Sequence, residues 1–309
     1  MVLAFVTGIL ATIIKSDLKF PEGMYQGLTI YLLFAIGLKG GVKLSQTSLA
    51  DFYKAGLSGI IMSCAIPFWA YYAFKKIARF DTINAAALAA HFGSVSAVTF
   101  SQSMVYMDTH QTTYEGFMPA LLAIMEVPAV LIALFIAKKG SQQKQSDNSE
   151  VLHELLTGKG IVLLIGGLLV GMLTGKKGFE QVSPLFEAPF KGILCLFLLE
   201  VGLVTGRRLF DLKKVGMQLI LVSLALPILN AFIGLWLAKW AGLSIGGSAI
   251  FAVLCASASY IAAPAAVRIA LPEANPSYYL TSALAVVFPF NVTIGIPLYL
   301  NMAHWIYSL

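Results

Sequence analysis

Charged residues are scarce in this sequence of 309 residues. They make up 12% of the chain, whereas a typical soluble domain carries about 25%. Hydrophobic residues make up 58%. A water-soluble fold of this size would lack the polar side chains needed to cover its surface, and a disordered chain would need low hydrophobicity and high charge. Both classes are therefore excluded.

Cysteine is scarce too. The three cysteines, Cys64, Cys195 and Cys255, each lie in an apolar run, which excludes a secreted disulfide scaffold. The sequence also lacks H-E-x-x-H, a P-loop, and G-x-S-x-G in a strand–turn–helix context. These absences disfavour an ATP-driven pump and an intramembrane metalloprotease, and no enzymatic activity is expected. The class of protein that remains is an all-α polytopic membrane protein.

Ten stretches are apolar enough to be membrane-spanning helices, each of which needs roughly 20 residues. They are 1–14, 25–43, 55–74, 83–106, 117–137, 160–175, 189–206, 215–238, 246–271 and 279–306. Basic residues cluster between these stretches, as in the cytoplasmic loops of membrane proteins, so nucleic-acid binding is not expected. The loops after the odd-numbered spans, together with Arg268 near the end of span 246–271, hold 14 of the 21 Lys and Arg residues. This bias predicts that both termini lie outside the cytoplasm.

The two halves of the chain resemble each other. Gly37 matches Gly202 at an offset of 165, and Ser94 and Ser96 match Ser257 and Ser259 at an offset of 163. We therefore expect a first repeat over 1–137, a cytoplasmic linker over 138–159 and a second repeat over 160–309. With five spans per half, the second repeat must enter the membrane inverted, and such 5+5 repeats are typical of secondary transporters.

The spans 83–106 and 246–271 each carry a Ser-x-Ser pair among small residues near the middle. Helices can be interrupted at such places, because hydroxyls and neighbouring helices satisfy the freed backbone groups. Two helices broken at the bilayer midplane would cross and point half-helix N-termini at a shared site for a small anion. The alternative is that these hydroxyls bond their own helical turn or allow close helix packing.

Glu126 lies in span 117–137 with apolar residues on both sides. A carboxylate at that depth costs on the order of 2.5 kcal/mol or more unless it is paired. Its counterpart in the second half is the stretch around Asn291. We expect a sodium site with Glu126 and Asn291 as the main side chains, and Ser96 and Thr99 as further oxygen ligands. A protonated Glu126 bonded between helices, or a proton relay, is the alternative.

Two other polar residues lie inside predicted spans without a counterpart in the other half. Glu200 is expected to make a packing or gating contact. His91, one turn before the first predicted break, is expected to be a satisfied interior histidine rather than a ligand.

Five motifs carry a family resemblance: residues 36–41 (IGLKGG), 92–96 (FGSVS), 125–129 (MEVPA), 271–278 (LPEANPSY) and 294–298 (IGIPL). Over nearly its whole length the chain resembles the sodium-dependent bicarbonate transporters known from cyanobacteria and other bacteria. The resemblance implies a ten-helix symporter of the bacterial inner membrane in which a core domain moves against a gate domain, commonly as a homotrimer.

The resemblance also implies where the ligands bind. Glu126 takes the position of an acidic residue in the cyanobacterial members, and sodium would lie close to it. Those members have an acidic residue where this chain has Tyr260, a difference that bears on the sodium site and the substrate. Their central loop is also longer, and its shortness here weakens the case for a PII-like regulator. Bicarbonate would bind between two sets of residues: Gly93, Ser94, Val95, Ser96 and Ala97 at the first break, and Ser257, Ala258, Ser259, Tyr260 and Ile261 at the second.

The sequence thus predicts a sodium-coupled symporter of a small monovalent anion, with bicarbonate as the first choice, working by elevator-type alternating access. Its partners would be the anion, Na⁺ as coupling ion and the lipid bilayer, with no other cofactor. Two alternatives remain at this point: a proton- or sodium-coupled carrier of a small organic acid, and a membrane receptor or subunit that does not transport.

Overall fold

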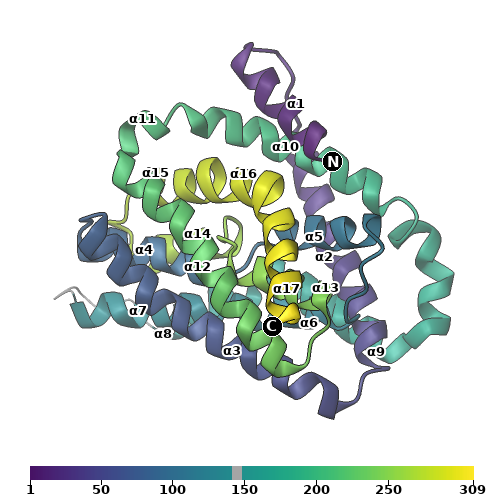
Figure 1. Cartoon of the computed structure of the whole chain (residues 1–309). Coiled ribbons are helices and arrows are strands. Elements are labelled where there is room, and N and C mark those ends of the chain that lie inside the picture. The colour runs from purple at the N-terminus through teal and green to yellow at the C-terminus, as the bar shows by residue number, and fades with distance from the viewer. Residues whose placement is uncertain (141–147) are drawn as a thin grey trace.

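The computed structural model describes residues 1–140 and 148–309, and within them it is helical, with no strand (Figure 1). The first half holds α1 (Val2–Ile13), α2 (Glu22–Leu44), α3 (Leu49–Tyr72), α4 (Thr82–Gly93), α5 (Ala97–Thr109), α6 (Met118–Glu126) and α7 (Pro128–Gly140). The second holds α8 (Asn148–Thr157), α9 (Lys159–Phe186), α10 (Phe190–Leu209), α11 (Leu212–Val215), α12 (Met217–Ala241), α13 (Ile245–Cys255), α14 (Ala262–Ala270), α15 (Pro276–Thr281), α16 (Phe288–Phe290) and α17 (Ile296–Ser308). Three π-helical segments, Ala73–Ile77, Ser282–Val287 and Asn291–Gly295, adjoin α3, α15 and α16.

Seven helical stretches of the described chain are long and apolar enough to cross a membrane. They are Glu22–Leu44, Leu49–Ile77, Thr82–Thr109, Met118–Lys138, Lys159–Phe186, Met217–Ala241 and Pro276–Ser308. Of the other expected spans, α1 and α13 are shorter apolar helices, and α10 has the length but carries four charged residues. The chain is therefore a multi-pass helical membrane protein, and the number ten stays a prediction.

α9 contains a kink at Gly175, whose φ of 59° and ψ of −162° interrupt the helix. Glycine adopts this positive φ without the steric cost that a side chain would bring. The predicted span 160–175 ends at the same residue. The last turn of α9 contacts α2, because the hydroxyl of Tyr31 donates to the carbonyl of Leu185 (2.6 Å) and the ring of Phe186 stacks on that of Tyr31.

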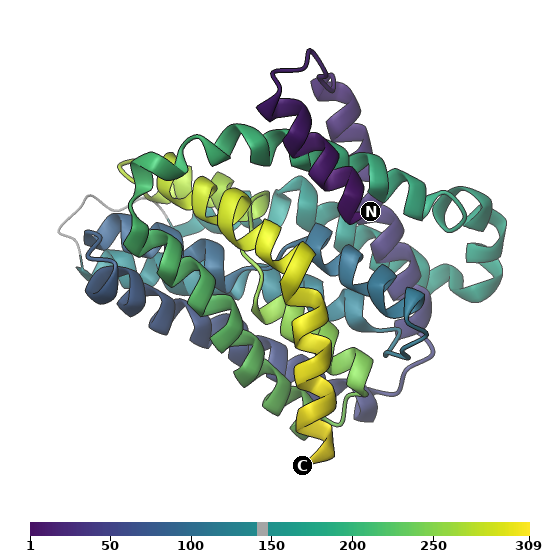
Figure 2. The ribbon, with the colours of Figure 1, turned by 45° about the horizontal axis from the view of Figure 1, so that its top comes forward.

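Glycines bring helices of the two halves into close contact. α1 packs on α10, and α2 packs on α9. A Cβ atom added to Gly37 would lie 2.5 Å from the carbonyl oxygen of Leu164 in α9, and one added to Gly202 would lie 3.0 Å from the Cα of Gly8 in α1. Larger residues at these positions would force the backbones apart. The four helices form one group, which we call the α1–α2–α9–α10 group (Figure 2).

The remaining long helices form a second group with paired contacts. α3 packs on α4 and α4 on α7 in the first half, while α12 packs on α13 and α13 on α17 in the second. In Figure 2 the C-terminal α17, in yellow, runs beside α12, in green. Each contact of the first half has a counterpart in the second.

The predicted linker 138–159 lies partly outside the described residues, because 141–147 are not described. Its later part forms α8, which packs on α14 with Val151 and Leu155 buried. The sequence did not predict this packed helix.

The loop before α15 connects distant parts of the chain. The side chain of Asn275 caps α15, because its Oδ1 accepts a hydrogen bond from the backbone amide of Ser277 (2.9 Å). The backbone amide of Asn275 donates to Oδ1 of Asn84 (2.8 Å). Asn84 lies in the first turn of α4, which Asp81 caps. Partial burial opposes ionisation of Asp81, but hydrogen bonds from Asn84 and backbone amides outweigh it and hold its pKa below its usual range.

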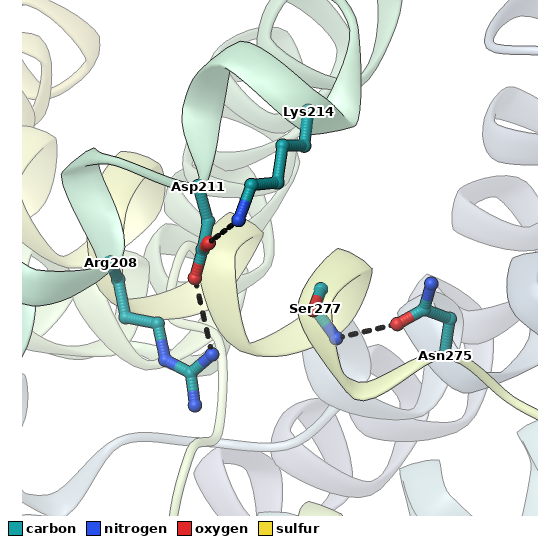
Figure 3. Close-up of polar contacts among 5 residues, drawn as sticks. All are labelled: Arg208, Asp211, Lys214, Asn275 and Ser277. Carbon is teal, nitrogen blue, oxygen red and sulfur yellow. Dashed lines mark hydrogen bonds and ion pairs between the residues drawn. The ribbon is translucent and has the colours of Figure 1, made fainter.

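Figure 3 shows Asn275 near a second polar cluster, where α10 gives way to α11. Asp211 forms ion pairs with Arg208 (3.4 Å) and Lys214 (3.1 Å). The hydrogen bond from Lys214 and the two positive charges lower the pKa of Asp211. This partly exposed cluster connects the end of α10 to the start of α11.

Candidate functional site

Both helices that carry a Ser-x-Ser pair are interrupted. α4 ends at Gly93 and α5 begins at Ala97, with Ser94 in extended backbone (φ −86°, ψ 167°) between them. α13 ends at Cys255 and α14 begins at Ala262. Gly93 fits closely at the end of α4, because an added Cβ would lie 2.6 Å from Cγ of Pro67 in α3. We call residues 94–96 the first break and residues 256–261 the second.

The second break is hydrogen-bonded to the end of the helix that precedes the first break. The amide of Ser259 donates a hydrogen bond to the carbonyl oxygen of His91 (2.8 Å), in the last turn of α4. A backbone bond between segments 168 residues apart in the chain fixes the first half against the second at this point.

The second serine of each pair accepts a hydrogen bond from the first turn of the helix that follows. Ser96 is the N-cap of α5, whereas Ser259 lies two residues before Ile261, the N-cap of α14. Oγ of Ser96 accepts hydrogen bonds from the amide (3.3 Å) and hydroxyl (3.0 Å) of Thr99 in α5. Oγ of Ser259 accepts one from the amide of Ala263 in α14 (3.3 Å). Such bonds satisfy only part of the free amides of a first helical turn. α5 and α14 therefore present partly unsatisfied N-termini where the breaks meet.

The first serine of each pair has a structural role. The hydroxyl of Ser257 donates to the carbonyl of Val253 in its own helix (2.6 Å), which is the back-bonding alternative. The hydroxyl of Ser94 instead donates to the carbonyl of Glu126 at the end of α6 (3.1 Å). Both serines are buried.

A small cavity lies between the breaks, with a volume of about 10 Å³, roughly the room for one water molecule. Gly93, Ser94, Ser257 and Ala258 do not line it, and all four are buried nearby in the protein. The predicted substrate residues that line it are Val95, Ser96, Ala97, Ser259, Tyr260 and Ile261. Three further residues also line it: Leu33, Glu126 and Gly160.

The structure brings Glu126 and Ser96 to this cavity but not the other two predicted sodium ligands. A Cβ added to Gly160 would lie 3.3 Å from Oε1 of Glu126, so the carboxylate faces the start of α9. None of the three ion pairs in the described chain includes Glu126. Thr99 lies one helical turn behind Ser96 and does not line the cavity.

Asn291 is fully buried and its side chain is already bonded. Its Nδ2 donates to the carbonyl of Ala256 (2.8 Å), and its Oδ1 accepts from the hydroxyl of Tyr299 (2.8 Å). Asn291 therefore holds the second break, much as Glu126 holds the first through its backbone carbonyl. Within the described residues no cluster of three His, Cys, Asp or Glu side chains could hold a metal ion.

Further cavities adjoin the one between the breaks and share lining residues with it. A narrow cavity shares Leu33, Ala97 and Ile261 with it, and shares Ile36 with a large cavity of about 890 Å³ on one side. On the other side Tyr260 is shared with a cavity of about 340 Å³. The large cavity lies along the C-terminal half of α2 and the 340 Å³ cavity at its N-terminal end, so the series follows α2 past the two breaks.

The ends of this series differ in charge. The large cavity is lined by four lysines, Lys39, Lys43, Lys176 and Lys191, with three acidic residues among them. The 340 Å³ cavity contains the carboxylates of Glu22 and Glu200 and no basic residue. The sequence did not predict that Lys39 lines the large cavity. A lysine within an apolar span can equally extend its amine to the membrane surface.

His91 is completely buried against Tyr279, with ring centroids 4.4 Å apart. Its Nδ1 lies 2.7 Å from the carbonyl of Ala87, and its Nε2 has no partner. The expectation of an interior histidine agrees with this burial, although only one ring nitrogen is bonded.

Comparison with known proteins identifies the family of this chain. The model of the Na⁺-dependent bicarbonate transporter superfamily matches residues 1–304. A comparison with curated proteins finds no match.

Proposed function

The chain belongs to the Na⁺-dependent bicarbonate transporter superfamily, and on that premise we propose that it is a sodium-coupled symporter of a small monovalent anion, with bicarbonate as its substrate. The observation that carries the proposal is that residues of both breaks line one cavity, next to which the backbone hydrogen bond from Ser259 to His91 joins the second break to the last turn of α4. The anion would bind between Ser96 and Ser259.

The electrostatics of the breaks support an anion. α5 and α14 begin at the cavity, so their positive dipole ends and free amides face it. No Lys or Arg lines the cavity. A small anion would thus be held by backbone dipoles. It would be released more easily than from a site that contains a buried Lys or Arg.

The size of the cavity favours a very small anion. Its volume of about 10 Å³ must increase for any solute to enter, and the increase needed for bicarbonate is smaller than for an organic acid of several carbons. This observation ranks bicarbonate ahead of the organic-acid alternative.

Sodium coupling rests on Glu126. Its side chain is half-buried at the same cavity as Ser96 and has no ion-pair partner, and an unpaired carboxylate within a membrane span is costly. A bound Na⁺ would neutralise it and would also reduce the cost of moving an anion through a medium of low dielectric. Hard cations prefer oxygen ligands of this kind.

We further propose that 1–137 and 160–309 are inverted repeats of five spans each. Gly8 and Gly171 correspond at an offset of 163, as Gly37 and Gly202 do at 165. Gly8 packs on Gly202, and Gly171 packs on α2 beside Gly41. The first span of each half therefore packs on the second span of the other, as a two-fold relation requires.

Elevator-type movement would occur between the two helix groups. The series of cavities runs where the α1–α2–α9–α10 group, through Leu33 and Ile36 of α2, meets the breaks. Sliding of the break helices along this boundary would move the anion site from one end of the series to the other. The trimer, the bacterial inner membrane and the external termini remain part of the same proposal.

The proposal is tested by labelled bicarbonate uptake into liposomes that contain the purified protein, with and without a sodium gradient and across a panel of small anions. We expect sodium-dependent bicarbonate uptake. Uptake of an organic acid but not bicarbonate would favour the alternative carrier, and an absence of sodium-dependent flux of any anion would favour the receptor or subunit.

A further inference from the structure

The cavity of about 340 Å³ beside the second break has an acidic lining. Glu22 and Glu200 line it, together with Tyr25 and Tyr260, and no Lys, Arg or His does. It is separate from the cavity that holds Glu126, but Tyr260 lines both.

Glu200 is the unusual residue of this cavity. It lies midway along α10, its side chain is only 7% exposed, and its Oε2 has no hydrogen-bond partner. No ion pair of the described chain includes it, and Arg207, the next basic residue of α10, is exposed. A buried carboxylate without a partner is costly and is normally compensated by a cation or a proton.

The neighbouring groups supply oxygen atoms for a cation. The hydroxyl of Tyr260 is buried and also lacks a hydrogen-bond partner. The side chain of Tyr25, which stacks on Phe197 of α10 (5.3 Å between ring centroids), lines the same cavity. The cavity also has room for water molecules that would complete the coordination of a small ion.

We propose that Glu200 and Tyr260 form a binding site for a monovalent cation, Na⁺ first, that is separate from the site at Glu126. This inference deepens the proposed function and rests on it for its role. Tyr260 belongs to the second break and Glu200 to α10, so an ion held by both would connect the moving break to the α1–α2–α9–α10 group. It would also neutralise a carboxylate that otherwise repels an anion leaving the breaks.

The site is tested by the melting temperature of the purified full-length protein in detergent, measured while NaCl replaces choline chloride at constant ionic strength. The test uses Glu126→Gln as background, so that the first sodium site does not contribute. We expect Na⁺ to raise the melting temperature of Glu126→Gln. We expect the added substitution Glu200→Gln to abolish this rise, and Tyr260→Phe to increase the half-saturating Na⁺ concentration at least threefold.

Glu273→Gln in the same background is the matched control, because Glu273 is an exposed carboxylate that lines none of these cavities, and it should leave the Na⁺ response unchanged. If the Glu200→Gln protein does not fold, Glu200→Asp should show a weakened response instead. The site is overturned if Glu126→Gln shows no Na⁺ response, if Glu200→Gln keeps it, or if only pH changes the melting temperature. Loss of sodium-dependent uptake in liposomes with a persisting response at Glu200 would instead overturn the proposed function alone.

Discussion

At the scale of single residues, the two serines of each Ser-x-Ser pair have different roles. Ser96 and Ser259 accept hydrogen bonds from the first turns of α5 and α14 at the cavity, whereas Ser257 bonds its own helical turn. The sequence could place all four serines, because small polar residues in an apolar span indicate a break. It could not assign their roles, because hydrogen-bond partners depend on how distant helices pack.

The same limit explains Asn291. Its position opposite Glu126 in the repeat could be predicted, and an amide oxygen is a reasonable sodium ligand. Only the packing shows that Tyr299 and Ala256 already use its side-chain atoms.

The first prediction concerns Glu126. Replacing it with glutamine removes the negative charge and keeps the shape, so Na⁺ should no longer stimulate bicarbonate uptake in liposomes. Glu273→Gln, which removes an exposed carboxylate outside these cavities, should behave as the wild type. Full sodium stimulation in Glu126→Gln would remove this residue from the ion site.

At the scale of helices, close packing between the halves depends on glycine. The sequence showed the glycines and their offset, and from them the similarity of the halves could be predicted. It could not show that α1 packs on α10 and α2 on α9, because a pattern of small residues indicates a close contact without identifying the partner helix. α8 was missed for a related reason: polar residues around Val151 and Leu155 hide its short apolar face.

The second prediction tests this packing. Gly37→Ala places a methyl group against the carbonyl of Leu164, and overpacking of this kind typically costs about 1–3 kcal/mol. We therefore expect a lower melting temperature in detergent. Gly166→Ala in α9 is the matched control, because nothing lies within 4 Å of its added Cβ. Equal melting temperatures for the two variants would show that α2 and α9 do not pack as described.

A third prediction concerns the start of α4, where Asp81 accepts hydrogen bonds from the amides of Ile83 and Asn84 (both 2.9 Å). Loss of an N-cap costs about 0.5–2 kcal/mol, so Asp81→Ala should lower the stability of the folded protein. Asp81→Asn should retain most of it, since asparagine caps helices almost as well. Chemical denaturation monitored by circular dichroism would measure the difference, and equal losses in both variants would indicate that the charge matters rather than the cap.

At the scale of the whole molecule, composition was enough to predict a multi-pass helical membrane protein, since 12% charged residues exclude the alternatives. The series of cavities along α2 could not be predicted, because cavities form between side chains from several helices. Each end of this series of cavities combines residues from both halves of the chain. The large cavity has Lys39 and Lys43 with Lys176 and Lys191, and the smaller one has Glu22 with Glu200.

The fourth prediction concerns energetics. If one Na⁺ moves with one bicarbonate, no net charge crosses the membrane, and a tenfold sodium gradient supplies about 1.4 kcal/mol. Liposomes should then accumulate bicarbonate about tenfold at most, and a potential imposed with K⁺ and valinomycin should not alter that limit. Accumulation that follows the imposed potential would contradict a one-to-one ratio.

The central claim is that the anion binds where the two breaks meet, and the most direct measurement is the KM for bicarbonate of serine variants in liposomes at saturating sodium. Ser96→Val and Ser259→Val each remove a hydrogen-bond acceptor at the cavity and should raise KM about tenfold or more. Ser257→Ala removes only a bond within its own helix and should leave KM near that of the wild type. Unchanged KM values in both valine variants would contradict binding at the breaks.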